Sequence, residues 1–135
     1  MDRQQTLSII KPDAVERKLD SEIKEMFKDS GFSIIKEKKI QIEKSEAEKF
    51  YKVHETKPFY NDLCNYLSSG PVVAMVLEKE NAVASYRQLI GATDPTKADD
   101  NTIRKLYALD KSFNSVHGSD SIENAKLEIS IIFGD

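Results

Sequence analysis

The chain has 135 residues, 39% of them hydrophobic and 32% charged, which is typical of one globular domain, and we expect a single domain over residues 1–135. Its net charge of −3 provides no general attraction to nucleic acid, and its single cysteine excludes an internal disulfide. No apolar run approaches the ~20 residues of a membrane span, and no apolar leader begins the chain. We therefore expect a cytoplasmic protein.

The N-terminal part of the chain predicts two strands separated by a helix. Residues 5–11 are apolar and partly β-branched, and they predict a buried strand. Residues 20–30 predict a helix that ends at a glycine. Residues 32–42 predict a second strand, whose lysines are typical of an exposed sheet edge.

The middle of the chain predicts two helices, a strand and a further helix. The first helix begins at Ser45, which forms a Ser-x-x-Glu capping box with Glu48, and a second helical segment spans residues 59–69. Residues 71–79 form a near-continuous apolar run, which is typical of a central strand. Residues 80–91 predict a helix that ends at its last residue, a glycine.

The C-terminal part of the chain begins with a polar segment, residues 92–115, that has no clear period. Irregular segments of this length in a compact domain are commonly functional. Residues 115–117 predict a short last strand, and residues 119–133 predict a helix capped by Asp120.

This order of elements predicts the α+β class. If the first helix and the helix over residues 80–91 are crossovers, the chain forms a ferredoxin-like βαββαβ unit. We expect an antiparallel sheet with helices on one face and a long loop before His117. Many unrelated functions share this fold, so function has to be inferred from the site.

The stretch NSVHGSDS, residues 114–121, contains a candidate nucleophile, His117. A neutral imidazole keeps a nitrogen lone pair that can attack phosphorus or carbon. Gly118 has no Cβ and permits close approach, and Ser119 supplies a hydroxyl. Glu128 lies on the following helix, where its carboxylate can hold the second ring nitrogen and fix the tautomer. Taken alone, His117 can also be interpreted as a hydrogen-bonded loop histidine.

Several cationic and hydroxyl side chains suit a polyphosphate ligand. Lys11 ends the first strand beside a proline turn, and Arg87 precedes the stretch GATDP, which contains Thr93. Arg104 follows in the polar segment. Arginine binds phosphate through a planar fork of donors, and lysine adds a point charge. Each residue alone would be interpreted as a surface side chain, so the prediction depends on their combination.

Six stretches together resemble the nucleoside diphosphate kinase family: TLSIIKPDAV, FYKVHETKPFYNDL, SGPVVAMVLEKENAV, YRQLIGATDP, TIR and NSVHGSDS. They run from Thr6 to the last helix. Members of that family transfer the γ-phosphate of a nucleoside triphosphate, typically ATP, to a nucleoside diphosphate by a ping-pong route through a phosphohistidine. The resemblance implies an active enzyme with Mg²⁺ as cofactor, in which the nucleotide phosphates hold the ion without a direct protein ligand.

The resemblance also implies a role for each catalytic residue. His117 is the nucleophile, Glu128 orients it, and Ser119 donates a hydrogen bond to Glu128 or to the phosphoryl region. Lys11 and Tyr51 approach the transferred phosphate.

A nucleotide pocket that recognises sugar and phosphates rather than base edges is implied as well. Its arginines and threonine hold the diphosphate, its lysine and asparagine contact the sugar hydroxyls, and its phenylalanine stacks on the base. Stacking gives affinity without base identity, so broad nucleotide specificity follows. The residues implied are Lys11, Phe59, Arg87, Thr93, Arg104 and Asn114.

The chain departs from the family pattern at a few positions. Asn101 replaces a glycine in the stretch NTIR, and asparagine tolerates the left-handed backbone that a glycine adopts there. Leu106 stands where the family usually has an acid, so weaker loop anchoring or weaker subunit contacts are expected. His54 is interpreted as a surface or packing histidine, and Cys64 as a small buried hydrophobe.

Two other functions remain open. An inactive nucleotide-binding scaffold would keep the pocket and lose the nucleophile, but His117, Glu128, Lys11 and Arg104 are all present. An RNA-binding module would stack bases on sheet aromatics in a basic face, and the predicted strands here have almost no aromatics. We expect nucleoside di- and triphosphates as substrates, a homo-oligomer that is a tetramer or a hexamer, and neither a membrane nor a specific nucleic acid as partner.

Overall fold

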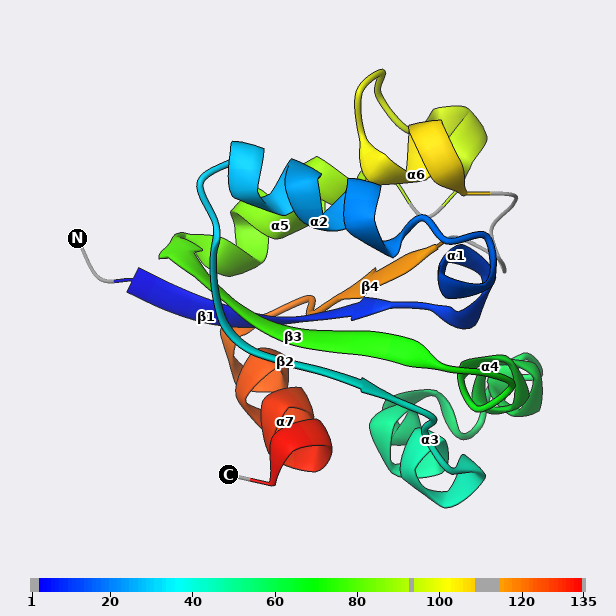
Figure 1. The fold of residues 1–135 in the computed structure, drawn as a ribbon. Helices are drawn as coiled ribbons and strands as arrows, with labels where there is room; N and C mark the ends of the chain where they lie inside the picture. The colour runs from blue at the N-terminus through cyan, green and yellow to red at the C-terminus, as the bar shows by residue number, and fades with distance from the viewer. Residues whose placement is uncertain (1–2, 93, 109–114, 135) are drawn as a thin grey trace.

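The computed structural model describes residues 3–92, 94–108 and 115–134. Four strands form one antiparallel sheet in the order β2-β3-β1-β4 (Figure 1). The strands are β1 (Arg3–Ile10), β2 (Ser33–Ile40), β3 (Val72–Glu80) and β4 (Val116–Gly118). This order is the one expected for a βαββαβ unit, so the predicted fold class is confirmed.

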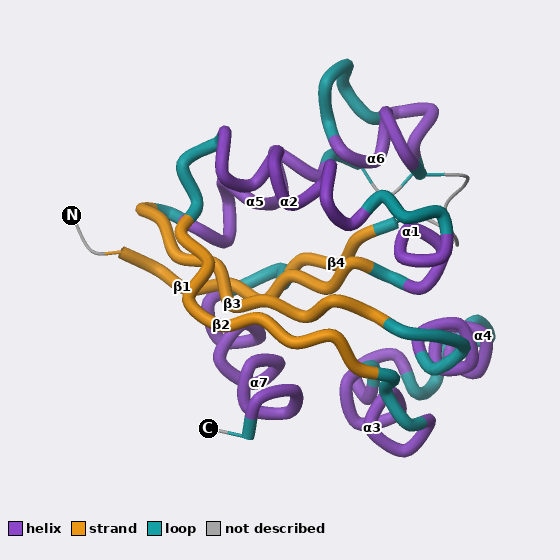
Figure 2. The backbone as a smooth tube through the Cα atoms, in the orientation of Figure 1, coloured by secondary structure: helices purple, strands orange, loops and turns teal. Residues whose placement is uncertain are grey.

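Helices pack on both faces of this sheet (Figures 1 and 2). The crossover helices α2 and α5 lie on one face, while α3, α4 and α7 lie on the other, so the expectation of helices on one face is incomplete. No described helix is long and apolar enough to cross a lipid bilayer. The described helices are α1 (Pro12–Glu16), α2 (Asp20–Asp29), α3 (Lys44–Phe50), the 3₁₀ turn η1 (Lys52–His54), α4 (Tyr60–Leu67), α5 (Ala82–Ile90), the 3₁₀ turn η2 (Pro95–Lys97), α6 (Ile103–Tyr107) and α7 (Ile122–Phe133).

Two hydrophobic clusters, one on each face, hold the helices to the sheet. On one face Ile10 and Met75 pack with Phe27 and Tyr86 from α2 and α5. On the other face the sheet packs against Phe50 and further residues of α3, α4 and α7. Because side chains alternate along a strand, β3 is buried on both faces, which explains its near-continuous apolar sequence.

Helix starts differ in detail from the predictions. Helix α3 begins one residue before Ser45, and its capping box is formed by Glu43 and Glu46. Helix α7 is capped by Ser121 rather than Asp120. In both cases two polar residues close together compete for the cap, and only the backbone conformation selects one of them.

The polar segment over residues 92–115 contains the short elements η2 and α6 in its described part. Helix α6 has five residues, which is too short to show a helical period in the sequence. The backbone at Asn101 has a φ of 69°, so the expectation that this asparagine adopts a left-handed conformation is confirmed.

Candidate active site

The candidate nucleophile, His117, is the middle residue of β4. This strand pairs with β1 so that Ile9 lies opposite His117. Alternation along the strand turns Gly118 towards α5 and the imidazole towards the opposite face, where the Phe50 ring lies 4.8 Å away at 69° to it. The strand register therefore directs His117 into the layer of α3 and α7.

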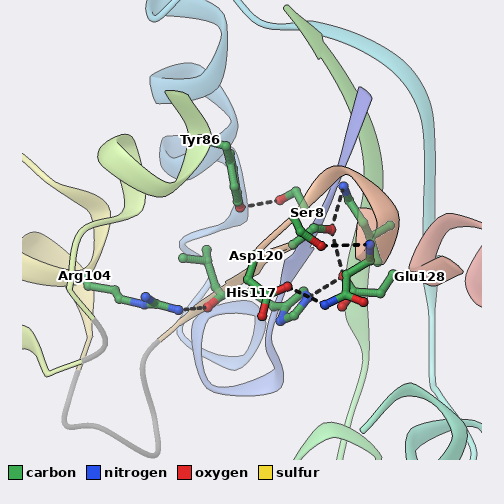
Figure 3. A network of polar contacts seen from close by, with 11 residues as sticks. Ser8, Tyr86, Arg104, His117, Asp120 and Glu128 are labelled. Carbon is green, nitrogen blue, oxygen red and sulfur yellow. Dashed lines mark hydrogen bonds and ion pairs between the residues drawn. The ribbon is translucent and has the colours of Figure 1, made fainter. Parts of the chain in front are cut away.

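One carboxylate oxygen holds the imidazole in place (Figure 3). The Nε2 atom of His117 lies 2.9 Å from Oε1 of Glu128, and the Ser119 hydroxyl donates to the same oxygen at 2.7 Å. A hydrogen bond to a carboxylate requires the proton on Nε2, so Nδ1 keeps its lone pair. Within the described part of the chain, Nδ1 has no hydrogen-bond partner.

A cavity of about 210 Å³ lies over the imidazole at the β4 edge of the sheet. Elements from both helical layers line it. Tyr51 comes from the end of α3, Arg87 from α5, Arg104 from α6 and Glu128 from α7. Residues distant in the sequence thus meet around His117, and the cavity combines two guanidinium groups with one possible nucleophile.

Three residues that line the cavity each have a buried polar atom without a hydrogen-bond partner among the described residues. The atoms are the Tyr51 hydroxyl, Nδ1 of His54 and Nε of Arg104. Buried polar groups are normally paired, so these atoms are suited to a polar ligand. Burial, and then the negative charge of Glu128, raise the pKa of Tyr51 above its usual range, so its hydroxyl stays a donor.

Arg104 is anchored by two backbone carbonyls while its charge faces the cavity. Its Nη1 donates to the carbonyl of Gly91 and its Nη2 to that of Val116, both at 3.0 Å. Burial lowers the pKa of Arg104, and the nearby positive charge of Arg87 adds to the effect. An anion between the two guanidinium groups would relieve this repulsion.

Lys11 is buried at the end of β1, next to the cavity wall rather than in it. Burial, and then the positive charge of Arg104, lower its pKa to about 7, and the charge of Asp13 offsets part of the shift. The lysine Nζ lies 5.6 Å from the centre of the Tyr66 ring. Lys11 is therefore a buried amine with a pKa near neutral pH, and an anion bound beside it would favour its charged form.

The predicted base-stacking residue, Phe59, lies further out. Its side chain is 45% exposed, and its ring centre is 6.0 Å from that of His54, whose ring is in turn 6.3 Å from Tyr51. The rings of Tyr51, His54 and Phe59 thus form a row, with Phe59 at its exposed end. The other two predicted contacts, Thr93 and Asn114, lie outside the described residues.

Sequence reasoning missed His54 and misassigned Asp120. The sequence predicts His54 to be a surface or packing residue, whereas in the structure it lines the cavity. Its spacing of three residues from Tyr51 was the available signal, because residues i and i+3 share one face of a helix. Asp120 accepts a hydrogen bond from the side-chain amide of Asn124, and both residues line the cavity.

A four-stranded α+β fold in which a carboxylate-bound histidine faces a cavity lined by two arginines is the arrangement expected of an enzyme of the phosphotransferase class. The sequence model described as nucleoside diphosphate kinase matches residues 4–135. The chain belongs to the nucleoside diphosphate kinase family, and nucleoside diphosphate kinase activity is its function. The predictions of family, enzyme class and function are confirmed.

The similarity extends over nearly the whole chain in sequence and structure. The nucleoside diphosphate kinase of Phenylobacterium zucineum is 52% identical, covering 96% of this chain and 94% of its own. That of Nitratiruptor sp. is 54% identical, with 96% and 95% covered. The crystal structure of the Aquifex aeolicus nucleoside diphosphate kinase superposes with a TM-score of 0.95 at 41% identity, covering 98% of this chain and 96% of that one.

Proposed function

We propose that the chain transfers the γ-phosphate of a nucleoside triphosphate, typically ATP, to a nucleoside diphosphate through a phosphohistidine at Nδ1 of His117. In the first half-reaction Nδ1 attacks the γ-phosphorus, the bond from phosphorus to the bridging oxygen breaks, and the diphosphate leaves. In the second half-reaction a terminal oxygen of another diphosphate attacks the phosphorus and the imidazole is released. The contact between Nε2 and Glu128 carries the proposal, because it leaves Nδ1 as the free nitrogen.

Charge neutralisation and alignment are the protein's main contributions to such a reaction. Arg87 and Arg104 would bind the phosphate oxygens, and Lys11 would bring a further positive charge beside them. The Tyr51 hydroxyl, buried and without a partner among the described residues, would donate to the transferred phosphate. Glu128 would stabilise the positive charge that the ring acquires when Nδ1 bonds to phosphorus.

Nucleotide binding would continue outward from the phosphates. Phe59 would stack on the base, Asn114 and Lys11 would contact the sugar hydroxyls, and Thr93 would join the arginines at the diphosphate. Because stacking does not read base edges, we expect broad specificity among the nucleotides. The exposed position of Phe59, outside the cavity and next to His54, supports a base that lies further from His117 than the phosphates do.

Mg²⁺ would neutralise charge between the phosphates when bound. The family generally uses this ion. Among the described residues no group of three or more His, Cys, Asp or Glu side chains could hold a metal. Such an ion would be held by the phosphate oxygens of the nucleotide, without a direct protein ligand.

A homo-oligomer, either a tetramer or a hexamer, is proposed for the chain in the cytoplasm. The exposed edge of β2, which pairs with β3 on one side only, supports association between copies. The single cysteine, Cys64, is buried and free, which suits a reducing compartment.

The direct test is incubation with γ-labelled ATP and Mg²⁺. We expect a phosphoprotein whose label is lost in acid and kept in alkali. Any added nucleoside diphosphate should accept the labelled phosphate and leave the protein unlabelled. The His117→Asn variant should bind ADP but remain unlabelled. If the folded wild-type protein binds ADP and takes up no label, the phosphohistidine proposal is wrong and the inactive scaffold is the better interpretation.

A further inference from the structure

A buried hydrogen bond joins β1 to α5 outside the cavity (Figure 3). The hydroxyl oxygens of Ser8 and Tyr86 lie 2.7 Å apart, and both side chains have no exposed surface. The Tyr86 ring is held between Phe27 and Phe32, at centroid distances of 5.4 and 6.0 Å. Tyr86 is therefore fixed both at its ring and at its hydroxyl.

The same ring lies directly against the backbone next to the nucleophile. Ser8 is the pairing partner of Gly118 in the sheet, and Gly118 follows His117. A Cβ added to Gly118 would be 2.6 Å from two carbon atoms of the Tyr86 ring, well inside normal contact. Only the absence of a side chain at Gly118 permits so close a contact between α5 and β4.

Helix α5 also positions the two arginines of the cavity. Arg87 follows Tyr86 in the helix and lines the cavity. Gly91, at the end of α5, supplies the carbonyl that anchors Nη1 of Arg104. The position of α5 on the sheet therefore determines where both guanidinium groups lie relative to β4.

We propose that Tyr86 is a positioning residue, whose bond to Ser8 and contact with Gly118 fix the spacing between His117 and the two arginines. This inference rests on the proposed phosphohistidine route. Tyr86 touches no substrate. It acts by preventing α5 from shifting along β1 and β4, and so keeps the phosphate-binding groups aligned with the attacking nitrogen.

The test compares the chemical step with ground-state binding in Tyr86→Phe. This variant keeps the ring and its packing but loses the hydroxyl. We expect the single-turnover rate of His117 phosphorylation at saturating ATP to fall about 10-fold, because a misplacement of ~1 Å can slow such reactions about 100-fold and a smaller shift should cost less. The dissociation constant for ADP, measured by calorimetry, should change far less.

The Ser8→Ala variant removes the same bond from the other side. If the bond itself matters, Ser8→Ala, Tyr86→Phe and the double variant should show similar rates, so the two losses will not add. Ser68→Ala is the matched control, since it loses a hydroxyl bond to the Cys64 carbonyl at 2.8 Å, away from the cavity. Its phosphorylation rate should equal that of the wild type.

Wild-type phosphorylation in folded Tyr86→Phe would overturn the positioning role, as would additive losses in the double variant. If Tyr86→Phe does not fold, the Ser8→Ala variant provides the test: a reduced phosphorylation rate supports the positioning role, and a wild-type rate contradicts it. Absence of label in the wild-type protein would instead contradict the phosphohistidine route, so the two failures are distinguishable.

Discussion

A single oxygen of Glu128 accepts hydrogen bonds from two groups, the His117 ring at 2.9 Å and the Ser119 hydroxyl at 2.7 Å. The Ser119 oxygen in turn accepts from the backbone amide of Leu7 at 3.4 Å. Because that amide belongs to β1, the orientation of the carboxylate is set by the central part of the sheet. The orientation of the imidazole is therefore fixed both by the backbone of β4 and by its hydrogen bond to Glu128.

Glu128→Gln tests the charge in this arrangement. The amide can still accept a hydrogen bond from Nε2, but it cannot stabilise the positive ring that forms when Nδ1 bonds to phosphorus. We expect the single-turnover rate of phosphohistidine formation, measured by rapid quench, to fall on the order of 100-fold. Ser119→Ala, which leaves the charge in place, should lose less. Equal rates in Glu128→Gln and the wild type would contradict the role of the carboxylate.

Lys11 should take up a proton when a nucleotide binds. Its pKa is about 7 in the free protein because of burial and the neighbouring Arg104, with Asp13 opposing the shift and the Tyr66 ring alongside. A bound phosphate adds negative charge beside it and should raise this pKa. Calorimetry of ADP binding at pH 8 in buffers of different ionisation enthalpy should show proton uptake, which should be absent in Lys11→Met. Uptake that is the same in both proteins would exclude Lys11 as its source.

The same lysine should destabilise the free protein below neutral pH. The unfolded chain keeps Lys11 protonated to about pH 10, whereas the folded state releases the proton above about pH 7. Because the unfolded state binds more protons between these pH values, the contribution of Lys11 to the free energy of unfolding rises with pH from about 7 to about 10. Lys11→Met should therefore increase the free energy of unfolding by on the order of 2 kcal/mol at pH 6, and by less at pH 9. Denaturant unfolding measures the difference. The exposed Lys126→Met provides the control, for which no pH-dependent gain is expected.

Gly118→Ala should be destabilising through a steric clash alone. The new methyl group would lie 2.6 Å from the Tyr86 ring and 3.2 Å from Cδ1 of Ile90. Overpacking of this kind costs about 1–3 kcal/mol. Adding Tyr86→Leu should restore part of the thermal stability that Gly118→Ala loses. If the double variant is less stable than either single variant, contact between these residues is not the cause.

Phe59→Leu tests the base-stacking role. We expect the dissociation constants of ADP, GDP, CDP and UDP to rise together by about 10-fold, since stacking is worth roughly 1–3 kcal/mol per base. The melting temperature should hardly change, because the ring is 45% exposed. A rise confined to one base would indicate recognition of base edges instead.

The fold could be predicted from the sequence wherever the signal was local. Gly91 ends α5 with a φ of 87°, and the apolar run of β3 marked a strand buried on both sides. The five-residue helix α6 was not predicted because it is too short to show a helical period in the sequence. Helices on the second face were predicted individually, but their side of the sheet depends on packing that no local pattern reveals.

In the candidate site, too, local features could be predicted from the sequence and tertiary ones could not. His117, Ser119 and Glu128 could be grouped because they lie on adjacent elements at the end of the chain, and the structure brings them within hydrogen-bonding distance. The burial of Lys11 could not be predicted, because its neighbours, which include Tyr66 of α4 and Arg104 of α6, lie far from it in the sequence. His54 was missed for the same reason, since only tertiary packing turns its ring into the cavity.

The nucleophile lies on a strand of only three residues at one margin of the sheet, while the opposite margin is formed by eight-residue β2. A three-residue strand offers too few free backbone groups to template another polypeptide, so intermolecular strand addition is disfavoured where substrate must enter. The shortness of β4 thus disfavours strand addition beside the entrance to the cavity, and the proposed association between copies would use the longer edge, β2.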